Sequence, residues 1–151
     1  MSYDDQKPVG GAPTTQSLGF ELRLDVPFDE AIERVSQALR EQGFGILTRI
    51  DVRSTLKEKL DVDFRDYVIL GACNPKLAHR ALSARPDVGL LLPCNVTVEK
   101  AGDAVVVRIA NPEAMMATGG FEDDAAIVSV AAEARGLLRL AAESLERPPG
   151  A

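Results

Sequence analysis

Hydrophobic and polar residues alternate strictly from residue 18 to residue 26, which predicts a β-strand with one solvent-exposed face. Pro27 suits a helix start, and apolar residues then recur at helical spacing until Gly43 ends the run. Alternation resumes over residues 44–52 and predicts a second strand. Its shared face would hold Phe44, Ile46, Thr48, Ile50 and Val52.

The middle of the chain predicts a short helix, a buried strand and a second full helix. Thr55 and Glu58 have the spacing of a capping box, which favours one or two helical turns over residues 54–60. Residues 67–72 form an almost continuous apolar run of strand length. Asn74 then suits a helix N-cap with Pro75 at the first helical position, and Pro86 excludes continuation.

The last third predicts a hairpin followed by a long helix. Residues 89–100 alternate, with Leu90, Leu92, Cys94, Val96 and Val98 on one face, and a turn at 101–103 returns the chain through 104–110. A second Asn-Pro pair, at 111–112, caps a turn, and an apolar stripe over 127–145 predicts the last helix.

The order β-α-β-(short α)-β-α-β-β-α predicts an α+β fold with two layers, in which helices cover one face of a mainly antiparallel sheet. At 151 residues, 46% of them hydrophobic, the chain suits one domain, which we place at 18–146. Residues 1–17 are polar and lack periodicity, so we expect a disordered N-terminal tail, and we expect a flexible C-terminal tail at 147–151.

The net charge of −6 comes from dispersed acidic residues, and no basic stripe is present to follow a phosphate backbone. We therefore expect no nucleic-acid partner. The first residues show neither a positively charged leader nor an apolar run, and no segment approaches the roughly 20 apolar residues that span a bilayer. These features predict a cytoplasmic protein without a membrane partner.

Two cysteines, each followed directly by asparagine, mark the candidate site: Cys73-Asn74, which leads into Pro75, and Cys94-Asn95. Cys73 ends a predicted strand just before a helix N-terminus, where backbone N–H groups can stabilise a thiolate. Both cysteines are also explained by packing, since free cysteine is among the most buried residue types. Asn74 has a sufficient role as a cap, whereas asparagine is depleted in strands and Asn95 has no such explanation.

A metal site, a catalytic histidine and a nucleotide-binding site have less support from the sequence. Cys73, His79 and Cys94 are a chemically sensible metal-ligand set, but their spacing departs from the usual zinc patterns and no fourth ligand is evident. His79, the only histidine, is expected to face solvent, away from any base-holding partner. No nucleotide-binding glycine motif occurs, and no pattern in the sequence indicates which cofactor, if any, the protein binds.

In a sheet with helices on one side, the other face is not buried by helices. Leu47 and Leu91 lie opposite the main apolar faces of their strands, as do Val68 and Leu70 if Tyr67 and Ile69 face the helices. A second copy often buries such faces, so we expect a homodimer formed by sheet or edge contacts, although burial within one subunit is the alternative.

Three segments carry a family resemblance: GACNPKLAHRAL, GLLLPCNVTVEKAGDAVVV and ANPEAMM, with PFDEAIERVSQALREQGFGILTRIDVRSTLKEKL upstream. Over residues 18–146 the chain resembles the bacterial and archaeal domain-of-unknown-function 302 family, in its cysteine-containing branch. The resemblance implies a compact β-α-β type domain that forms homodimers, and it implies no established reaction. The resemblance also implies a candidate site at the positions that match the family's motifs: Gly71, Cys73, Asn74, Pro75, Pro93, Cys94 and Asn95.

Two functional hypotheses follow. The leading one is a noncatalytic homodimeric module that binds a small ligand or thiol at Cys73, Asn74, Pro75, Cys94 and Asn95. The alternative is a redox, sulfur-handling or soft-metal-binding protein in which Cys73 acts as a thiolate together with Cys94.

Overall fold

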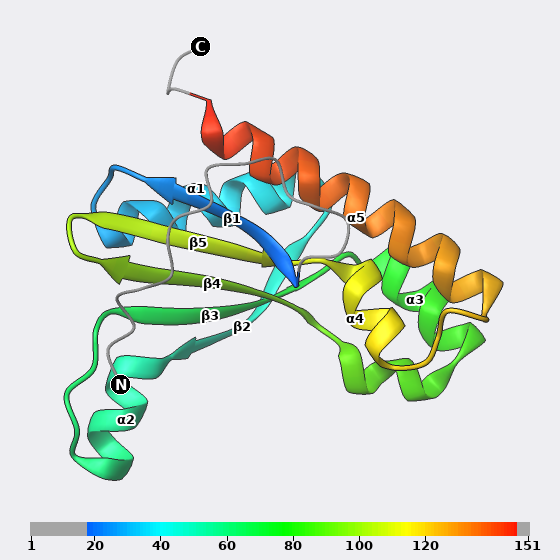
Figure 1. Cartoon of the computed structure of the whole chain (residues 1–151), viewed down its shortest axis with the longest axis horizontal. Coiled ribbons are helices and arrows are strands. Elements are labelled where there is room, and N and C mark those ends of the chain that lie inside the picture. The colour runs from blue at the N-terminus through cyan, green and yellow to red at the C-terminus, as the bar shows by residue number, and fades with distance from the viewer. Residues whose placement is uncertain (1–17, 148–151) are drawn as a thin grey trace.

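The computed structural model describes residues 18–147, which fold around one five-stranded antiparallel sheet (Figure 1). The strand order across the sheet is β1-β5-β4-β3-β2, so the first and second strands form its two edges. The predicted α+β class is confirmed. The strands are β1 (Gly19–Leu24), β2 (Gly45–Asp51), β3 (Tyr67–Cys73), β4 (Cys94–Ala101) and β5 (Ala104–Ala110).

Two long helices pack on one face of this sheet, and the shorter helices lie at its ends (Figure 1). We call the opposite face of the sheet the helix-free face. The helices are α1 (Phe28–Glu41), α2 (Val52–Leu60), α3 (Pro75–Ala84), the 3-10 helix η1 (Pro86–Leu91), α4 (Pro112–Thr118) and α5 (Ala125–Glu146). No helix within residues 18–147 combines the length and apolar character that crossing a membrane requires.

The core lies between the sheet and the two long helices. Alternate residues of the strands point into it, and the apolar sides of α1 and α5 meet them there. Burial of this apolar surface is the main favourable term in folding. Core residues with at most 1% exposure include Phe20, Val35, Leu39, Val68, Leu70, Val96, Val98, Val107, Ile109, Ile127 and Leu138.

The strand that contains Cys94 begins later than its alternation predicts. Residues 86–91 form η1 instead, and a cis peptide bond joins Leu92 to Pro93. Leu90, which the strand pattern placed on the inner face, is 89% exposed. A strand across Pro93 is disfavoured because proline lacks the N–H group that a sheet ladder needs. The predicted strand over 89–100 is therefore correct only from Cys94 onward.

The second strand also departs from its predicted pattern. Its register with β3 shifts between Ile46 and Thr48, so that Leu47 is an extra residue and the two ends of the strand present different faces. The expected common face from Phe44 to Val52 is wrong, since Phe44 is buried and Ile50 is exposed.

Two helix starts also differ from prediction. Asp51 caps α2 by accepting a hydrogen bond from the Ser54 backbone, so the capping box at Thr55 and Glu58 is wrong. Residues 112–118, expected as a turn, form the α-helix α4, capped by the Asn111 side chain.

The tails expected at 1–17 and 147–151 lie outside the described residues, apart from Arg147.

The orientation of β3, left open by its apolar run, is decided by packing. Val68, Leu70 and Ala72 are buried beneath the helices, and the residues between them belong to the helix-free face. By the same alternation and register, the helix-free face carries Glu21, Arg23, Thr48, Ile50, Tyr67, Ile69, Gly71, Asn95, Thr97, Glu99, Val106 and Arg108.

Candidate functional site

The two Cys-Asn motifs, 21 residues apart in the chain, meet at one end of the sheet. Strands β3 and β4 pair in register, with Ala72 opposite Cys94 and Gly71 opposite Asn95. Cys73 is the last residue of β3, and Cys94 is the first residue of β4. The structure thus brings together the two Cys-Asn motifs that sequence analysis identified in separate segments.

Asn74 and Pro75 form the start of α3. The Asn74 side-chain oxygen accepts a hydrogen bond from the Leu77 backbone at 3.3 Å, and Pro75 occupies the first helical turn, as predicted. The Asn74 amide nitrogen also lies 3.0 Å from where a Cβ on Gly43 would be. The Asn74 side chain therefore lies close to the turn at Gly43, which has a positive φ of 84°.

The two sulfurs belong to opposite faces of the sheet. Cys94 shares a face with Val96 and packs against the core, whereas Cys73 follows the buried Ala72 and so belongs to the helix-free face. Both cysteines are free and half-buried. The pairing of Ala72 with Cys94 makes the cysteines diagonal neighbours on adjacent strands, with side chains directed apart.

Neither thiol is activated by its surroundings. Burial raises the pKa of Cys73, and it raises the pKa of Cys94 to about 11, with a further contribution from the charge of Cys73. Removal of a thiolate from water disfavours the charged form. This direction is opposite to the lowered pKa that a thiolate stabilised by the N-terminus of α3 would require.

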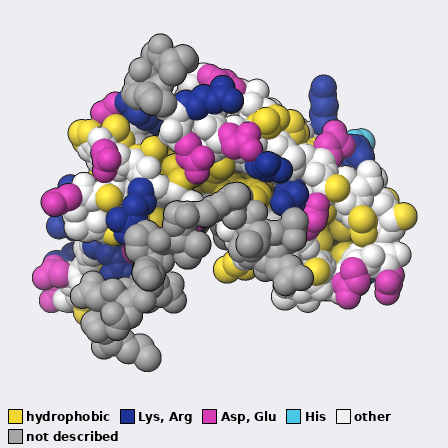
Figure 2. Space-filling view, turned by 45° about the horizontal axis from the view of Figure 1, so that its top comes forward, with side chains coloured by type: hydrophobic (Ala, Val, Ile, Leu, Met, Phe, Trp, Pro, Cys, Tyr) yellow, Lys and Arg dark blue, Asp and Glu magenta, His cyan; other side chains and the backbone are white. Residues whose placement is uncertain are grey.

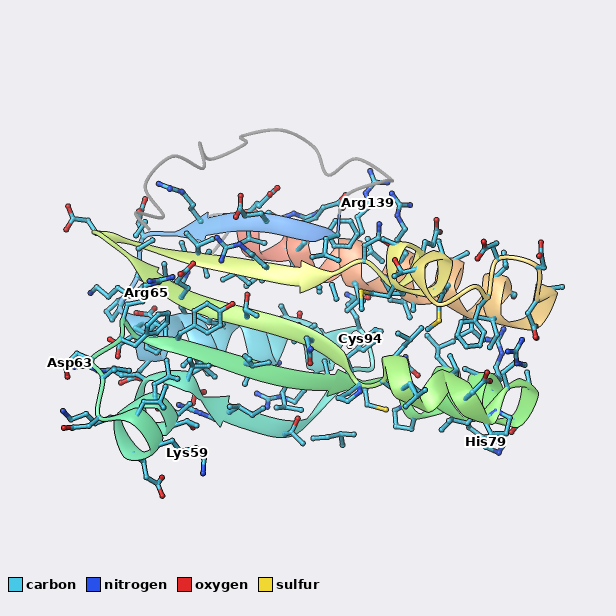
Figure 3. All side chains as sticks on the ribbon, turned by 60° about the horizontal axis from the view of Figure 1, so that its bottom comes forward. Lys59, Asp63, Arg65, His79, Cys94 and Arg139 are labelled. Atoms are coloured by element: carbon cyan, nitrogen blue, oxygen red, sulfur yellow. The ribbon has the colours of Figure 1, made fainter. Side chains whose placement is uncertain are left out.

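The remaining predicted residues lie apart. Asn95 is exposed at the helix-free face. His79 is exposed on α3, at a distance from Cys94 (Figure 3). Within residues 18–147, no three His, Cys, Asp or Glu side chains are placed to hold a metal ion. The set of Cys73, His79 and Cys94 is therefore not assembled.

Gly71, which pairs with Asn95, lies close to side chains of neighbouring segments. A Cβ at this position would be 2.2 Å from the Thr48 Oγ1 atom and 2.8 Å from the Pro93 Cγ atom. Side chains from β2 and from the residue before β4 therefore close over the backbone of Gly71. This close approach explains a glycine in the middle of a buried strand.

Replacement of Gly71 by alanine should lower the free energy of unfolding by about 1–3 kcal/mol, because the added methyl overlaps a branched side chain and a proline ring. Urea unfolding monitored by circular dichroism measures the change. Gly45→Ala is the matched control, since no atom lies within 4 Å of its added Cβ. Equal effects of the two substitutions would contradict this account of Gly71.

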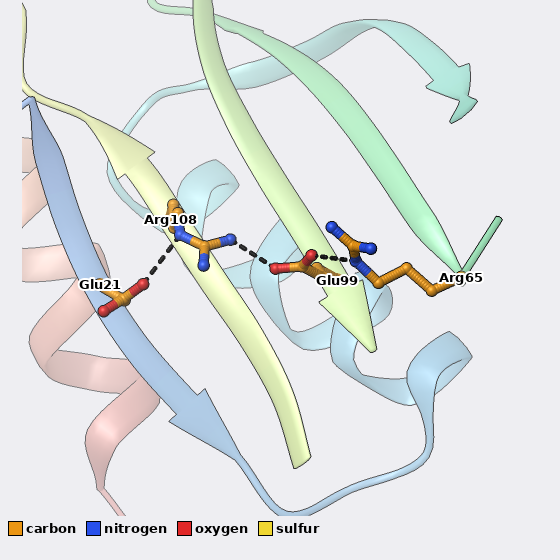
Figure 4. Close-up of polar contacts among 4 residues, drawn as sticks. All are labelled: Glu21, Arg65, Glu99 and Arg108. Atoms are coloured by element: carbon orange, nitrogen blue, oxygen red, sulfur yellow. Dashed lines mark hydrogen bonds and ion pairs between the residues drawn. The ribbon is translucent and has the colours of Figure 1, made fainter. Parts of the chain in front are cut away.

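Sequence reasoning missed a row of four charged side chains on the helix-free face (Figure 4). Glu21 of β1 accepts a hydrogen bond from Arg108 of β5 at 2.8 Å, and Arg108 also donates to Glu99 of β4 at 2.7 Å. Arg65, two residues before β3, binds the other oxygen of Glu99. We call these four residues the charge row. Alternation indicated the polar faces of the strands, but only the register shows which charges are neighbours.

Glu99 at the centre of the charge row is a buried carboxylate, with 5% of its side chain exposed. Burial alone raises the pKa of Glu99, but hydrogen bonds from Arg108 and Arg65, together with their positive charges, more than offset it. The net pKa of Glu99 is below its ordinary value. Glu99 is therefore ionised at neutral pH, held between two guanidinium groups.

Elsewhere, opposite charges are interspersed. In the view of Figure 2, basic and acidic side chains alternate over the described surface, and neither sign forms a continuous patch. A groove between α3 and α5 is lined by His79, Arg80, Ser83 and Ser129 with small apolar residues. Within this groove, Arg80 is bound to Glu133 at 2.6 Å.

Together these features define a two-layer α+β domain with one helix-covered and one charged, helix-free sheet face. The chain belongs to the family described as Domain of unknown function DUF302, whose model matches residues 20–145. It is similar to a solved structure, an uncharacterized conserved DUF302 protein from Bacillus stearothermophilus, with 31% identity and a TM-score of 0.72. That match covers 83% of this chain and 94% of the other. No curated protein matches the chain.

Proposed function

We propose that this protein is a noncatalytic homodimeric module that binds a small ligand at the corner formed by Cys73, Asn74, Pro75, Cys94 and Asn95. The observation that supports this proposal most directly is the pairing of β3 with β4, which joins two separate Cys-Asn motifs at one sheet end. The same end is next to the start of α3, so three elements contribute to one corner.

The groups at this corner indicate the kind of ligand. Cys73 offers a protonated thiol and Asn95 offers an exposed amide, while the Asn74 oxygen is already engaged by the Leu77 backbone. These are uncharged hydrogen-bonding groups. The corner therefore suits a small neutral polar molecule or a small thiol, with Asn95 and Cys73 in contact. Asn74, Pro75 and the backbone of Cys94, whose sulfur packs against the core, shape the site.

Homodimerisation is the second part of the proposal. Both Cys73 and Asn95 belong to the helix-free face, which α1 and α5 leave uncovered. A second copy on this face would close the corner from the side that is open in one copy. The ligand site would then include surface from both subunits.

Thermal denaturation in the presence of a panel of small amides, alcohols and thiols tests the ligand site. A binding compound should raise the Tm of the wild type, and Asn95→Ala should abolish that increase. Gln37→Ala, at an exposed position of α1, is the control and should retain the wild-type response. A compound that raises the Tm of Asn95→Ala as much as that of the wild type would place binding elsewhere.

The alternative function, thiol chemistry at Cys73 and Cys94, makes an opposite prediction about reactivity. With a pKa of about 11, against an ordinary value of 9.0, Cys94 should be alkylated roughly 100-fold more slowly than a free cysteine at neutral pH. Cys73 should also react more slowly than a free thiol. Iodoacetamide labelling of the native protein from pH 6 to pH 10, quantified for each cysteine by mass spectrometry, measures both rates.

The denatured protein serves as the reference for these rates, because unfolding removes the effect of burial. Rapid labelling of native Cys73 near pH 6 would support the redox or sulfur-handling alternative and contradict the binding module.

A further inference from the structure

The surface groove between α3 and α5 has a volume of about 500 Å³. Small-molecule sites in proteins usually have volumes of about 300–1,000 Å³. The groove uses residues 79–84 of α3 and 126–130 of α5, so it begins beyond the first turn of α3 that borders the Cys-Asn corner. Figure 3 shows His79 on this part of α3, at a distance from Cys94. The groove is therefore large enough for a small ligand and separate from that corner.

The buried part of the groove lining is apolar. Val130 is 6% exposed, and Ala84 and Ala126 also line the groove. Because one alanine comes from each helix, the space between the helices is left open where longer side chains would fill it. Small-molecule sites combine such an apolar surface with a few polar groups. A ligand with an apolar portion would lose part of its contact with water here.

The polar part of the lining favours a negatively charged ligand. Among the described residues that line the groove, Arg80 carries a permanent positive charge and none carries a carboxylate. His79 and the hydroxyl groups of Ser83 and Ser129 complete the polar set. Arginine and serine side chains donate hydrogen bonds, and the planar guanidinium matches the two oxygens of a carboxylate.

Contacts with α5 hold the Arg80 guanidinium in place. Its Nη1 atom donates to Glu133 at 2.6 Å, and its Nη2 atom donates to the Ser129 hydroxyl at 3.4 Å. A guanidinium has five N–H donors, so these two contacts leave donors for another acceptor. The Arg80 side chain is 46% exposed, which lets an anion approach it from solvent. Because Glu133 partly offsets the charge of Arg80, we expect a Kd of about 1 mM.

We propose that the groove between α3 and α5 binds a small organic carboxylate. The carboxylate binds Arg80 and the neighbouring serine hydroxyls, and the apolar portion packs against Val130, Ala84 and Ala126. This site goes beyond the proposed function, because none of its residues belongs to the Cys-Asn corner. A neutral amide lacks the charge that Arg80 recognises, and an inorganic anion lacks the apolar portion.

Benzoate is the test compound, and His79 is the reporter. His79 is the only histidine of the chain, so NMR can follow its imidazole signals in the full chain without a histidine tag. Sodium benzoate is added at constant pH, because histidine signals also respond to protonation. The His79 signals should shift and saturate with a Kd of about 1 mM, and signals that stay unchanged up to about 10 mM benzoate would overturn the inference.

A pair of variants separates the charge of Arg80 from its structural contact with α5. Arg80→Gln should weaken benzoate binding at least about 10-fold, because it removes charge-assisted hydrogen bonds. Glu133→Gln breaks the same ion pair but keeps the guanidinium, so binding should be retained or become tighter. Equal weakening by both variants would contradict recognition by Arg80.

Far-UV circular dichroism and the Tm show whether each variant is folded. If Arg80→Gln is not, Arg80→Ala replaces it, since alanine suits an exposed helical position, and it should weaken binding to the same extent.

Two further compounds test the class of ligand. Benzamide is the neutral analogue of benzoate, and inorganic phosphate is an anion without an apolar portion. Each should bind at least about 10-fold more weakly than benzoate. Benzamide that binds as well as benzoate would exclude recognition of a carboxylate. Phosphate that binds equally well would exclude the contribution of the apolar lining.

Asn95→Ala distinguishes this groove from the Cys-Asn corner. The variant should bind benzoate as the wild type does, because Asn95 does not line the groove. Loss of benzoate binding in Asn95→Ala would place the compound at the corner and overturn this inference. Retained benzoate binding supports the groove even if no amide, alcohol or thiol binds at the corner, a result that would contradict only the proposed function.

Discussion

Replacement of Leu138 by alanine should lower the free energy of unfolding by about 2–5 kcal/mol, the largest effect that we expect from a single substitution. Leu138 lies in the middle of α5 with none of its surface exposed, within the core between the helices and the sheet. Its truncation removes apolar contacts and leaves a cavity that surrounding side chains fill only in part. Urea denaturation followed by circular dichroism measures the change.

Leu140→Ala is the matched control, two residues along the same helix. Leu140 is 50% exposed, so its truncation removes little buried surface and should change the free energy of unfolding by less than about 1 kcal/mol. A similar loss at both positions would contradict the placement of α5 against the sheet.

Glu99→Ala should destabilise the protein by about 2–3 kcal/mol at neutral pH, the second largest effect. The substitution leaves Arg65 and Arg108 without the carboxylate that binds both. Breaking a fully buried ion pair costs about 3–5 kcal/mol, and we expect less because both arginine side chains are more than one-third exposed to water. Glu21→Ala removes one partly exposed pair of the same row and should cost about 1 kcal/mol or less.

The effect of Glu99 should depend on pH in a defined direction. Its pKa in the folded protein lies below the ordinary value of 4.5, so the folded state favours the ionised form. The stabilisation is complete above about pH 4.5 and is lost as the pH falls through the folded pKa. The stability difference between wild type and Glu99→Ala should therefore shrink in acid. A difference that stays constant from pH 7 to pH 3 would contradict an ionised Glu99.

The elements that sequence analysis predicted correctly are those whose information is local. The alternation in β1 and the helical spacing in α1 and α5 each place apolar groups on one side of a single segment. Asn74 with Pro75 marks the start of α3 through contacts within one turn. These patterns need no knowledge of the neighbouring segment, since a strand or helix with one apolar side must bury it.

The predictions that failed depended on neighbouring segments. The bulge at Leu47 reverses the faces of β2 through its pairing with β3, and alternation alone cannot show it. Residues 89–92 alternate like a strand, yet a 3-10 helix that begins at Pro86 extends to Leu91, and a cis peptide bond precedes Pro93. The direction in which β3 faces was open because its apolar run supports either side.

The candidate site shows the same division. The sequence by itself determined the α+β class, the capping role of Asn74 and the two Cys-Asn motifs as residues of interest. Only the tertiary structure decided that these motifs meet, that burial keeps their thiols protonated, and that Glu99 lies between two arginines from other segments. The physical reason is that periodicity records which side of a segment is buried, whereas strand register and desolvation depend on which distant segments pack against it.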